Sequence, residues 1–288
     1  MNRPTFSILT PTYNCAQFIL RSYHSLISQT KSDWEWVIVN DGSLDNTEEI
    51  INSINDNRIK FHTYEKNRGR GYARNLGLSK CEGNVVVVWD IDDLYLPARL
   101  HRIYETILVQ NYDFMVSQAI VVDNFFNFKS IRGFSQSKLM RGFVHPTLAF
   151  KSELVKEINY DKTMSAGEDL LVMIMLSNGY NGKYLDENLM VYFEDREVNL
   201  LKTRQMHKSH TITIQKVLDE KLVNISALDS LIIKATLLLK KIVLNMFMLR
   251  PSFYLLTVKF RNKKSIAIAE EQALSKIIND IKKQYSKL

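Results

Sequence analysis

Three carboxylates follow a run of apolar residues in the segment VVVVWDIDDLYLP at positions 85–97. Asp90, Asp92 and Asp93 lie within four positions, and like charges this close repel most strongly where water is scarce. Carboxylate oxygens are the ligands that Mg²⁺ and Mn²⁺ prefer, and such an ion usually keeps waters and also binds substrate phosphates. The cluster therefore predicts a divalent-metal site, and the alternative is an acidic turn in solvent.

The elements around this cluster alternate between strand and helix patterns. Strands are predicted at 6–10, 34–41, 58–65 and 84–90, and helices at 16–30, 43–54 and 71–81. This alternation, with short connections, predicts a parallel sheet covered by helices, and ligands bind outside the carboxyl ends of such strands. Because TPTYN, NDGS and DIDD follow three of the strands, these polar segments should meet at one edge of the sheet.

The composition is that of a globular protein. The chain has 288 residues, of which 45% are hydrophobic and 24% charged, enough for one large α/β domain or two smaller ones. With only Cys15 and Cys81, a disulfide framework is excluded and a reducing compartment is favoured. The first residues lack the apolar core of a signal peptide, and no apolar run of about 18 residues predicts a membrane span. We therefore expect a cytoplasmic protein.

Five motifs occur in a fixed order along the chain: FSILTPTYNCAQFILRSYHSLISQT, WEWVIVNDGSLDNT, NRGRGYARNLGL, WDIDDLYLP and GEDLL. Each is weak alone, but their order and intervals resemble those of family 2 glycosyltransferases of the inverting GT-A type. The resemblance is dense over residues 5–100, thins to GED at 167–169 and ends near residue 215. It implies an α/β, Rossmann-like, mainly parallel sheet with helices on both faces. We expect a GT-A domain over 1–215, with a nucleotide-binding half at 1–100 and an acceptor-side half at 101–215, and a helical basic region at 216–288.

The resemblance implies a nucleotide-sugar donor, usually a UDP-sugar, and a divalent ion, Mn²⁺ or Mg²⁺. Asp92, with Asp90, would hold the ion against the diphosphate, and Asp169 of GED would be the catalytic base. A carboxylate at Asp41 suits uracil, because the N3–H of that base is a donor. The nucleotide-binding positions implied are Thr10, Pro11, Thr12, Tyr13, Asp41, Asn67, Arg74, Asp90 and Ile91.

Several of these positions also have a purely structural interpretation. Asp41 and Gly42 form a pair that is common in turns after strands. Glu168 and Asp169 could be first-turn acids that interact favourably with a helix dipole. This role and the base role are compatible, since one acid can cap the helix while the other takes a proton.

Further residues are candidates for donor or acceptor contacts. His207 and His210 are three apart, so on a helix they share a face and could reach the metal or the diphosphate, although surface positions are slightly favoured. His145 lies where the acceptor side of the cleft would be built, and Asp93 and Glu168 complete this set.

The predicted activity is metal-dependent transfer of one sugar, with inversion, to a glycan or lipid-linked glycan acceptor in bacterial surface glycan synthesis. Processive synthases carry a Q-x-x-R-W motif, whereas all three tryptophans here lie in the N-terminal half. Two alternatives stay open. One is a haloacid-dehalogenase-like phosphatase with Asp90 as nucleophile and Asp92 as acid, and the other is a catalytically inactive nucleotide-binding module. No nucleic-acid partner is predicted, and an oligomer is compatible with the sequence.

The net charge of +7 is concentrated near the C-terminus. No acid occurs between Ser230 and Ala269, a stretch that holds eight lysines and arginines. An apolar stripe at helical spacing begins at Leu228, and Pro251 should end that helix. One interpretation is a peripheral anchor, residues 228–264, on an anionic membrane at the inner face of the cytoplasmic membrane. The other is a helix packed on the catalytic domain.

Overall fold

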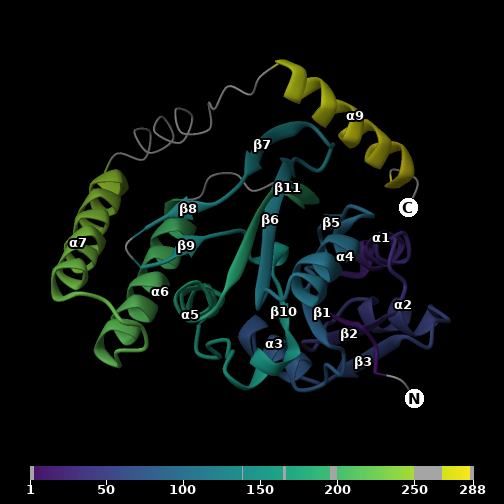
Figure 1. The fold of residues 1–288 in the computed structure, drawn as a ribbon, viewed down its shortest axis with the longest axis horizontal. Helices are drawn as coiled ribbons and strands as arrows, with labels where there is room; N and C mark the ends of the chain where they lie inside the picture. Colours follow the sequence, from purple (N-terminus) through teal and green to yellow (C-terminus); the bar gives the residue numbers. More distant parts are fainter. Residues whose placement is uncertain (1–2, 138, 165–166, 195–199, 250–267, 286–288) are drawn as a thin grey trace.

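The computed structural model describes residues 3–137, 139–164, 167–194, 200–249 and 268–285. Its centre is one mixed sheet in the order β3-β2-β1-β4-β10-β6-β11-β5, with β7 paired to β6 (Figure 1). Two short strands, β8 (Ser135–Gln136) and β9 (Arg141–Gly142), form a separate pair. The strands of the large sheet are β1 (Phe6–Thr12), β2 (Trp34–Asn40), β3 (Ile59–Thr63), β4 (Val85–Val88), β5 (Leu94–Tyr95), β6 (Phe114–Val122), β7 (Phe128–Arg132), β10 (Ala149–Lys151) and β11 (Gly182–Phe193).

The first four strands are parallel, as the alternating pattern predicted. β1 pairs with β2 and with β4, and β2 pairs with β3, all in parallel register. The second half of the chain adds the antiparallel strands. β10 lies antiparallel between β4 and β6, whereas β11 runs parallel to β6 and antiparallel to β5. The expected α/β fold is therefore confirmed, with a sheet that is parallel over β1 to β4 and mixed in the rest.

Helices cover both faces of this sheet. The described helices are α1 (Ala16–Ile27), α2 (Thr47–Ser53), α3 (Arg70–Leu78), α4 (Arg99–Ile103, continued by a π-helical turn at Tyr104–Val109), α5 (Leu170–Gly179), α6 (Leu200–Asp219), α7 (Ala227–Leu249) and α9 (Ile268–Tyr285). One hydrophobic cluster contains residues of α1, α2 and α4, and a second contains residues of α3 and α5.

The valine run of β4 is explained by these two clusters. Successive side chains of a strand point to opposite faces of the sheet. Val85 and Val87 pack in the cluster with α1 and α4, whereas Val86 and Val88 pack in the cluster with α3 and α5. All four are fully buried, so a continuous apolar run is what a central strand at this place requires.

The C-terminal region is helical, as expected. Ile233 of α7 and Val217 of α6 share a cluster with Leu170 and Ile174 of α5, while α9 packs on residues of β5, β6 and β11. None of the helices described is long and apolar enough to cross a membrane. Residues 250–264 of the expected anchor lie outside the described residues. Residue 215, where the catalytic domain was expected to end, lies inside α6. The division of the chain into domains stays a prediction.

Candidate active site

Three parallel strands end beside one another and carry the polar segments with them. Thr12 at the end of β1 pairs with Asn40 at the end of β2, and Leu9 of β1 pairs with Val88 of β4. The segments that follow these strands line a pocket of about 460 Å³. The polar segments therefore meet at one edge of the sheet, as the sequence predicted. The lining residues are Pro11, Thr12, Tyr13, Cys15, Asp41, Asn67, Gly69, Arg70, Ala73, Asp90, Ile91, Asp92, Met164 and Tyr192.

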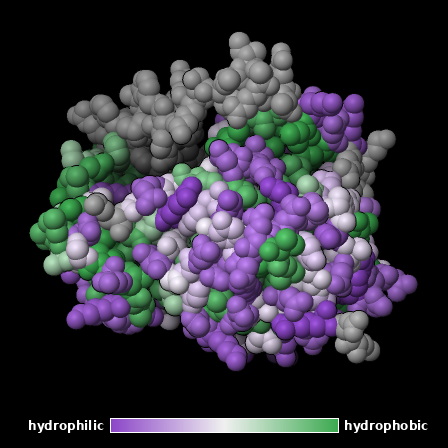
Figure 2. All heavy atoms as spheres, in the orientation of Figure 1, coloured by the Kyte–Doolittle hydropathy of each residue, from purple (hydrophilic) through white to green (hydrophobic). Residues whose placement is uncertain are grey.

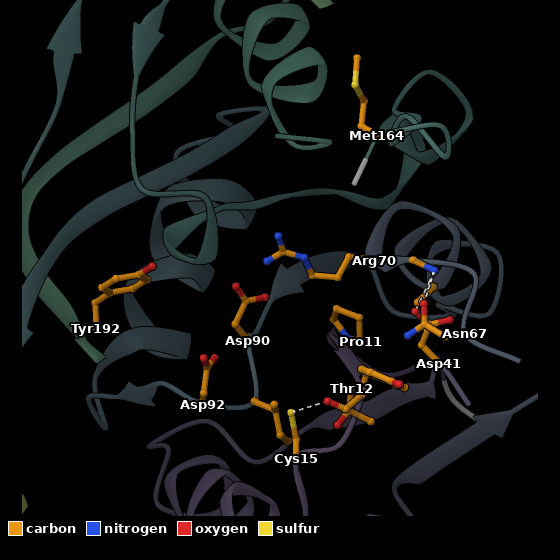
Figure 3. A pocket seen from close by; sticks show the side chains of 14 residues that line it. Pro11, Thr12, Cys15, Asp41, Asn67, Arg70, Asp90, Asp92, Met164 and Tyr192 are labelled. Atoms are coloured by element: carbon orange, nitrogen blue, oxygen red, sulfur yellow. Dashed lines mark hydrogen bonds between the residues drawn. The ribbon is translucent and has the colours of Figure 1, made fainter. Parts of the chain in front are cut away.

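Charged and polar groups are divided between two sides of the pocket. Figure 3 shows Asp90 and Asp92 beside each other on one side, and Asp41 with Asn67 on the opposite side. Arg70 projects from α3 between these two groups. A ligand that spans the pocket would thus meet a carboxylate at one end and a pair of carboxylates with a guanidinium at the other.

Asp41 fixes the loop that forms one wall of the pocket. Its Oδ1 accepts hydrogen bonds from the Tyr64 hydroxyl and the Arg68 amide, both at 2.7 Å, and its Oδ2 accepts one from the Gly69 amide at 2.9 Å. The turn after Asp41 needs glycine, because Gly42 has φ +68° and a Cβ there would lie 2.8 Å from the amide nitrogen of Asn67. Burial and the hydrogen bond to Asp41 raise the pKa of Tyr64 above its ordinary value.

Arg74 connects the two acidic motifs from inside the protein. Its Nη1 donates to Glu168 Oε1 at 2.7 Å and its Nη2 to Asp90 Oδ1 at 3.0 Å. Burial alone would lower the pKa of Arg74, but Asp90 and the other acids around it raise that pKa above the ordinary value. Arg70, one helical turn earlier, lies 3.3 Å from the same Glu168 oxygen through Nε. Glu168 is thereby paired on both sides.

Asp169 begins α5 directly after Glu168, at the N-cap position. Burial raises the pKa of its carboxyl, and the negative charge of Glu168 raises it further. A carboxyl with a raised pKa binds a proton more strongly than an ordinary aspartate, a property that suits a general base. Asp169 does not line the 460 Å³ pocket itself. Its neighbour Glu168 is joined by Arg74 to Asp90, which does line the pocket.

The acids after β4 differ in their surroundings. Asp90, whose side chain is 22% exposed, and Asp92 line the pocket. Asp93 is buried and accepts a hydrogen bond from the Phe193 amide at 3.0 Å, and burial raises the pKa of its carboxyl well above the ordinary value.

Asp90 and Asp92 therefore supply two oxygen-donor side chains at one place, which fits a hard divalent ion. Within the described part of the chain no group of three or more His, Cys, Asp or Glu side chains could hold a metal. An ion here would complete its shell with water or ligand phosphates.

Several predicted residues lie behind the pocket. Thr10 accepts a hydrogen bond from Trp36 Nε1 at 2.8 Å in the core. His145 is buried with Nε2 3.0 Å from the Tyr160 hydroxyl, and burial lowers its pKa well below the ordinary value.

His207 and His210 lie on α6 and do not line the pocket. His207 is buried, and a Cβ placed on Gly167 would lie 2.8 Å from Cδ2 of His210. Burial lowers the pKa of both imidazoles. His207 is thus not a surface residue, whereas His210 is partly exposed and lies against Gly167 of the GED segment.

Six lining residues were missed by sequence reasoning. For Arg70 and Ala73 a signal existed, since both share a short helix with Arg74. Tyr192 comes from β11 and Met164 from the segment before GED, and no local pattern indicates either position. Cys15 and Gly69 lie within motifs that were recognised, but neither was singled out as a lining residue.

The family model described as "Glycosyl transferase family 2" matches residues 7–161, more than half of the chain. The chain belongs to this family. The match favours glycosyltransferase activity over the phosphatase alternative, because the ends of β1, β2 and β4, which line the pocket, lie within it.

Relatives of this glycosyltransferase have divergent sequences. An uncharacterized glycosyltransferase of Methanocaldococcus jannaschii is 27% identical over 74% of this chain and 79% of its own length. The "UDP-Glc:alpha-D-GlcNAc-diphosphoundecaprenol beta-1,3-glucosyltransferase WfgD" of Escherichia coli is 32% identical over 41% of this chain and 47% of its own length.

Solved structures show that the fold of this glycosyltransferase is GT-A. TarS of S. aureus in complex with UDP-GlcNAc superposes with a TM-score of 0.60 at 21% identity, over 78% of this chain and 69% of TarS. The mannosyltransferase PcManGT of Pyrobaculum calidifontis, in complex with GDP-Man and Mn²⁺, superposes with a TM-score of 0.61 at 16% identity, over 96% of this chain and 81% of PcManGT.

Proposed function

We propose that this glycosyltransferase moves a single sugar from a uridine diphosphate sugar to an acceptor hydroxyl, with inversion at the anomeric carbon. One observation carries the proposal. The pocket presents Asp41 on one side and the Asp90–Asp92 pair on the other, at the strand edge where α/β folds bind ligands. A nucleoside diphosphate has the matching order of groups, a hydrogen-bonding base at one end and a diphosphate at the other.

The uracil end is assigned to Asp41. Its carboxylate already accepts three hydrogen bonds from the 64–69 segment, and two carboxylate oxygens offer about four acceptor positions. One position is thus left for the N3–H of uracil. A uridine donor is also supported by the UDP-GlcNAc bound to TarS and the UDP-Glc in the name of WfgD, whereas PcManGT was solved with GDP-Man. A guanosine donor is therefore the alternative.

The diphosphate end is assigned to Asp90, Asp92 and Arg70. Asp90 and Asp92 would hold one Mn²⁺ or Mg²⁺ ion, and PcManGT was solved with Mn²⁺. When bound, the ion supplies positive charge that stabilises the leaving diphosphate. Arg70 lines the same region with a side chain that is 55% exposed, so its guanidinium can also contact phosphate oxygens.

Asp169 is assigned as the base. The acceptor oxygen forms a bond to the anomeric carbon, the bond from that carbon to the diphosphate oxygen breaks, and the hydroxyl proton passes to the Asp169 carboxylate. Glu168 is held by Arg74 and Arg70, so it is less available for the proton than its neighbour. A single displacement needs no protein nucleophile, and it inverts the anomeric centre.

The acceptor is assigned as a glycan, free or lipid-linked, in the synthesis of a surface glycan. WfgD, whose name specifies a diphosphoundecaprenol-linked sugar, supports a lipid-linked acceptor. We place the reaction in the cytoplasm, where nucleotide sugars are available.

The test is release of nucleoside diphosphate from a panel of UDP-glucose, UDP-GlcNAc, UDP-galactose and GDP-mannose, with Mn²⁺ or with excess chelator. We expect metal-dependent release of UDP. Preferential release of GDP would move the donor assignment to guanosine. Full activity in chelator would remove the ion from the reaction, and binding of UDP without turnover of any donor would favour the inactive-module alternative.

A further inference from the structure

The helix α7 has two apolar faces, and among the described residues only one of them is packed. Ile233 and Leu244 are buried, and Ile233 and Leu237 pack in the cluster with α5 and α6. At 3.6 residues per turn, the opposite side of the helix is also apolar. We define the outer face of α7 as Leu228, Leu231, Ile232, Leu238, Leu239, Ile242, Val243, Met246 and Leu249.

The outer face is exposed along the whole helix. Leu231 is 64% exposed, Leu239 62%, Met246 63% and Leu249 83%. Figure 2 shows this hydrophobic surface at the left edge of the molecule, over the position of α7 in Figure 1. A helix of 23 residues is about 35 Å long, so the face is far more extensive than the scattered single apolar residues of an ordinary surface.

Lysines border the outer face on both sides. Lys234 and Lys241 lie along one edge and Lys240 beyond the other, all three are exposed, and Asp229 is the only acid of α7. An aliphatic face between cations is the pattern of a helix that lies in a membrane interface, where lysine stems extend along apolar surface and the ammonium groups reach anionic headgroups.

A second copy of the chain fits this face less well. Two copies packed through α7 would bring their lysines together, and the helix offers only Asp229 to compensate them. A protein partner also fits less well, because the residues that usually dominate protein interfaces are Trp, Tyr and Arg, and the outer face contains none of them.

We propose that the outer face of α7 binds the surface of an anionic lipid bilayer, with the helix axis parallel to that surface. The apolar side chains enter the headgroup boundary, and Lys234, Lys240 and Lys241 contact lipid phosphates. The proposal needs only a lipid surface, so it stands apart from the assignment of donor and acceptor.

The test is co-sedimentation of the full chain with vesicles of equal parts phosphatidylcholine and phosphatidylglycerol, compared with phosphatidylcholine alone. We expect binding to the anionic vesicles only, and weaker binding as salt is added. The variant Lys234→Gln/Lys241→Gln should bind these vesicles at least about tenfold more weakly than the parent protein, since each cation near an anionic surface contributes to the attraction. Leu231→Gln/Leu238→Gln should lose most binding.

Matched variants carry the same substitutions far from α7. Lys60→Gln/Lys80→Gln removes two exposed lysines and Leu44→Gln/Val109→Gln removes two exposed apolar residues, and both should bind like the parent protein. Circular dichroism checks that each variant is folded. The proposal is overturned if the full chain stays in the supernatant or if the α7 variants sediment like the parent. It is also overturned if light scattering shows a dimer that Leu231→Gln/Leu238→Gln turns into a monomer, because the face would then bind a second copy.

Discussion

Arg74 and Glu168 form a buried ion pair in which Nη1 and Oε1 are 2.7 Å apart. The same guanidinium contacts Asp90 at 3.0 Å, so one side chain of α3 joins the end of β4 to the start of α5. Asp90 lines the pocket and Glu168 directly precedes Asp169. Arg74 thus sets the spacing between the carboxylate assigned to the metal and the carboxylate assigned as the base.

Arg74→Met should destabilise the protein by about 3–5 kcal/mol, because it removes the buried partner of the Glu168 carboxylate and leaves only the half-exposed Arg70 beside it. Arg70→Met is the matched control. Arg70 contacts the same Glu168 oxygen at 3.3 Å, but its side chain is 55% exposed, so its loss should cost about 1 kcal/mol or less. The free energy of unfolding in urea measures both. Equal losses for the two variants would mean that burial does not distinguish these pairs.

If Mn²⁺ strengthens UDP binding as proposed, Asp92→Asn should remove that effect, a loss of about tenfold or more, because only Asp90 and Asp92 are assigned to the ion. Asp93→Asn is the control on the next residue. Its buried side chain can still accept the hydrogen bond from the Phe193 amide, so UDP binding should be kept. Calorimetric titration of UDP with and without Mn²⁺ separates the two. Loss of the Mn²⁺ effect in Asp93→Asn but not in Asp92→Asn would place the ion elsewhere.

Asp169→Asn should lower turnover by about 10²–10⁴-fold and leave UDP binding nearly unchanged, as expected for a positioned base. The pH profile gives an independent readout. A base works only when deprotonated, and burial raises the pKa of Asp169, so turnover should rise with pH over a range above that of an ordinary aspartate. Asp169→Asn should lack this rise. A variant that keeps the same rise would show that another group titrates.

Cys15 should react with maleimide faster than Cys81, and UDP with Mn²⁺ should protect it. Cys15 lines the pocket, whereas burial raises the pKa of the Cys81 thiol to about 12 and so keeps its reactive thiolate scarce. Burial also raises the pKa of Cys15, so its labelling should be faster at higher pH. Mass spectrometry after timed labelling follows both sites, with Cys15→Ser as the control. Labelling of Cys15 that UDP does not slow would argue against nucleotide binding in this pocket.

The edge of the sheet that holds the site could be predicted because apolar runs mark strands and parallel strands end together. That information is local, and it was enough to bring Asp41 and Asp90 to one pocket, while their roles stay predictions. It could not distinguish Arg70 from Arg74, which are one turn apart on α3. The family resemblance implied that Arg74 binds the nucleotide, whereas in the structure Arg74 is buried in ion pairs and Arg70 lines the pocket.

Other residues reach the pocket only because strands that are distant in the sequence pair with one another. Tyr192 reaches the pocket because β11 pairs with β6 and β5, and no pattern near residue 192 indicates it.

The helix predicted at 43–54 begins later, at Thr47, because Asp45 accepts hydrogen bonds from the amide and hydroxyl of Thr47 in the turn before it. Side chains that form hydrogen bonds with backbone groups a few residues away favour such turns over helix.

The placement of β10 between β4 and β6 has a consequence for synthesis on the ribosome. One edge of β4, the valine strand, has no partner until Lys151 has been added, and β5 has none until β11 is made. At usual rates of about 5–20 residues per second, the nascent chain therefore carries an unpaired, aggregation-prone strand edge for several seconds. A translation product that stops near residue 100 would keep this edge of β4 unpaired. We therefore expect the first half of the protein to aggregate more readily alone than together with the second half.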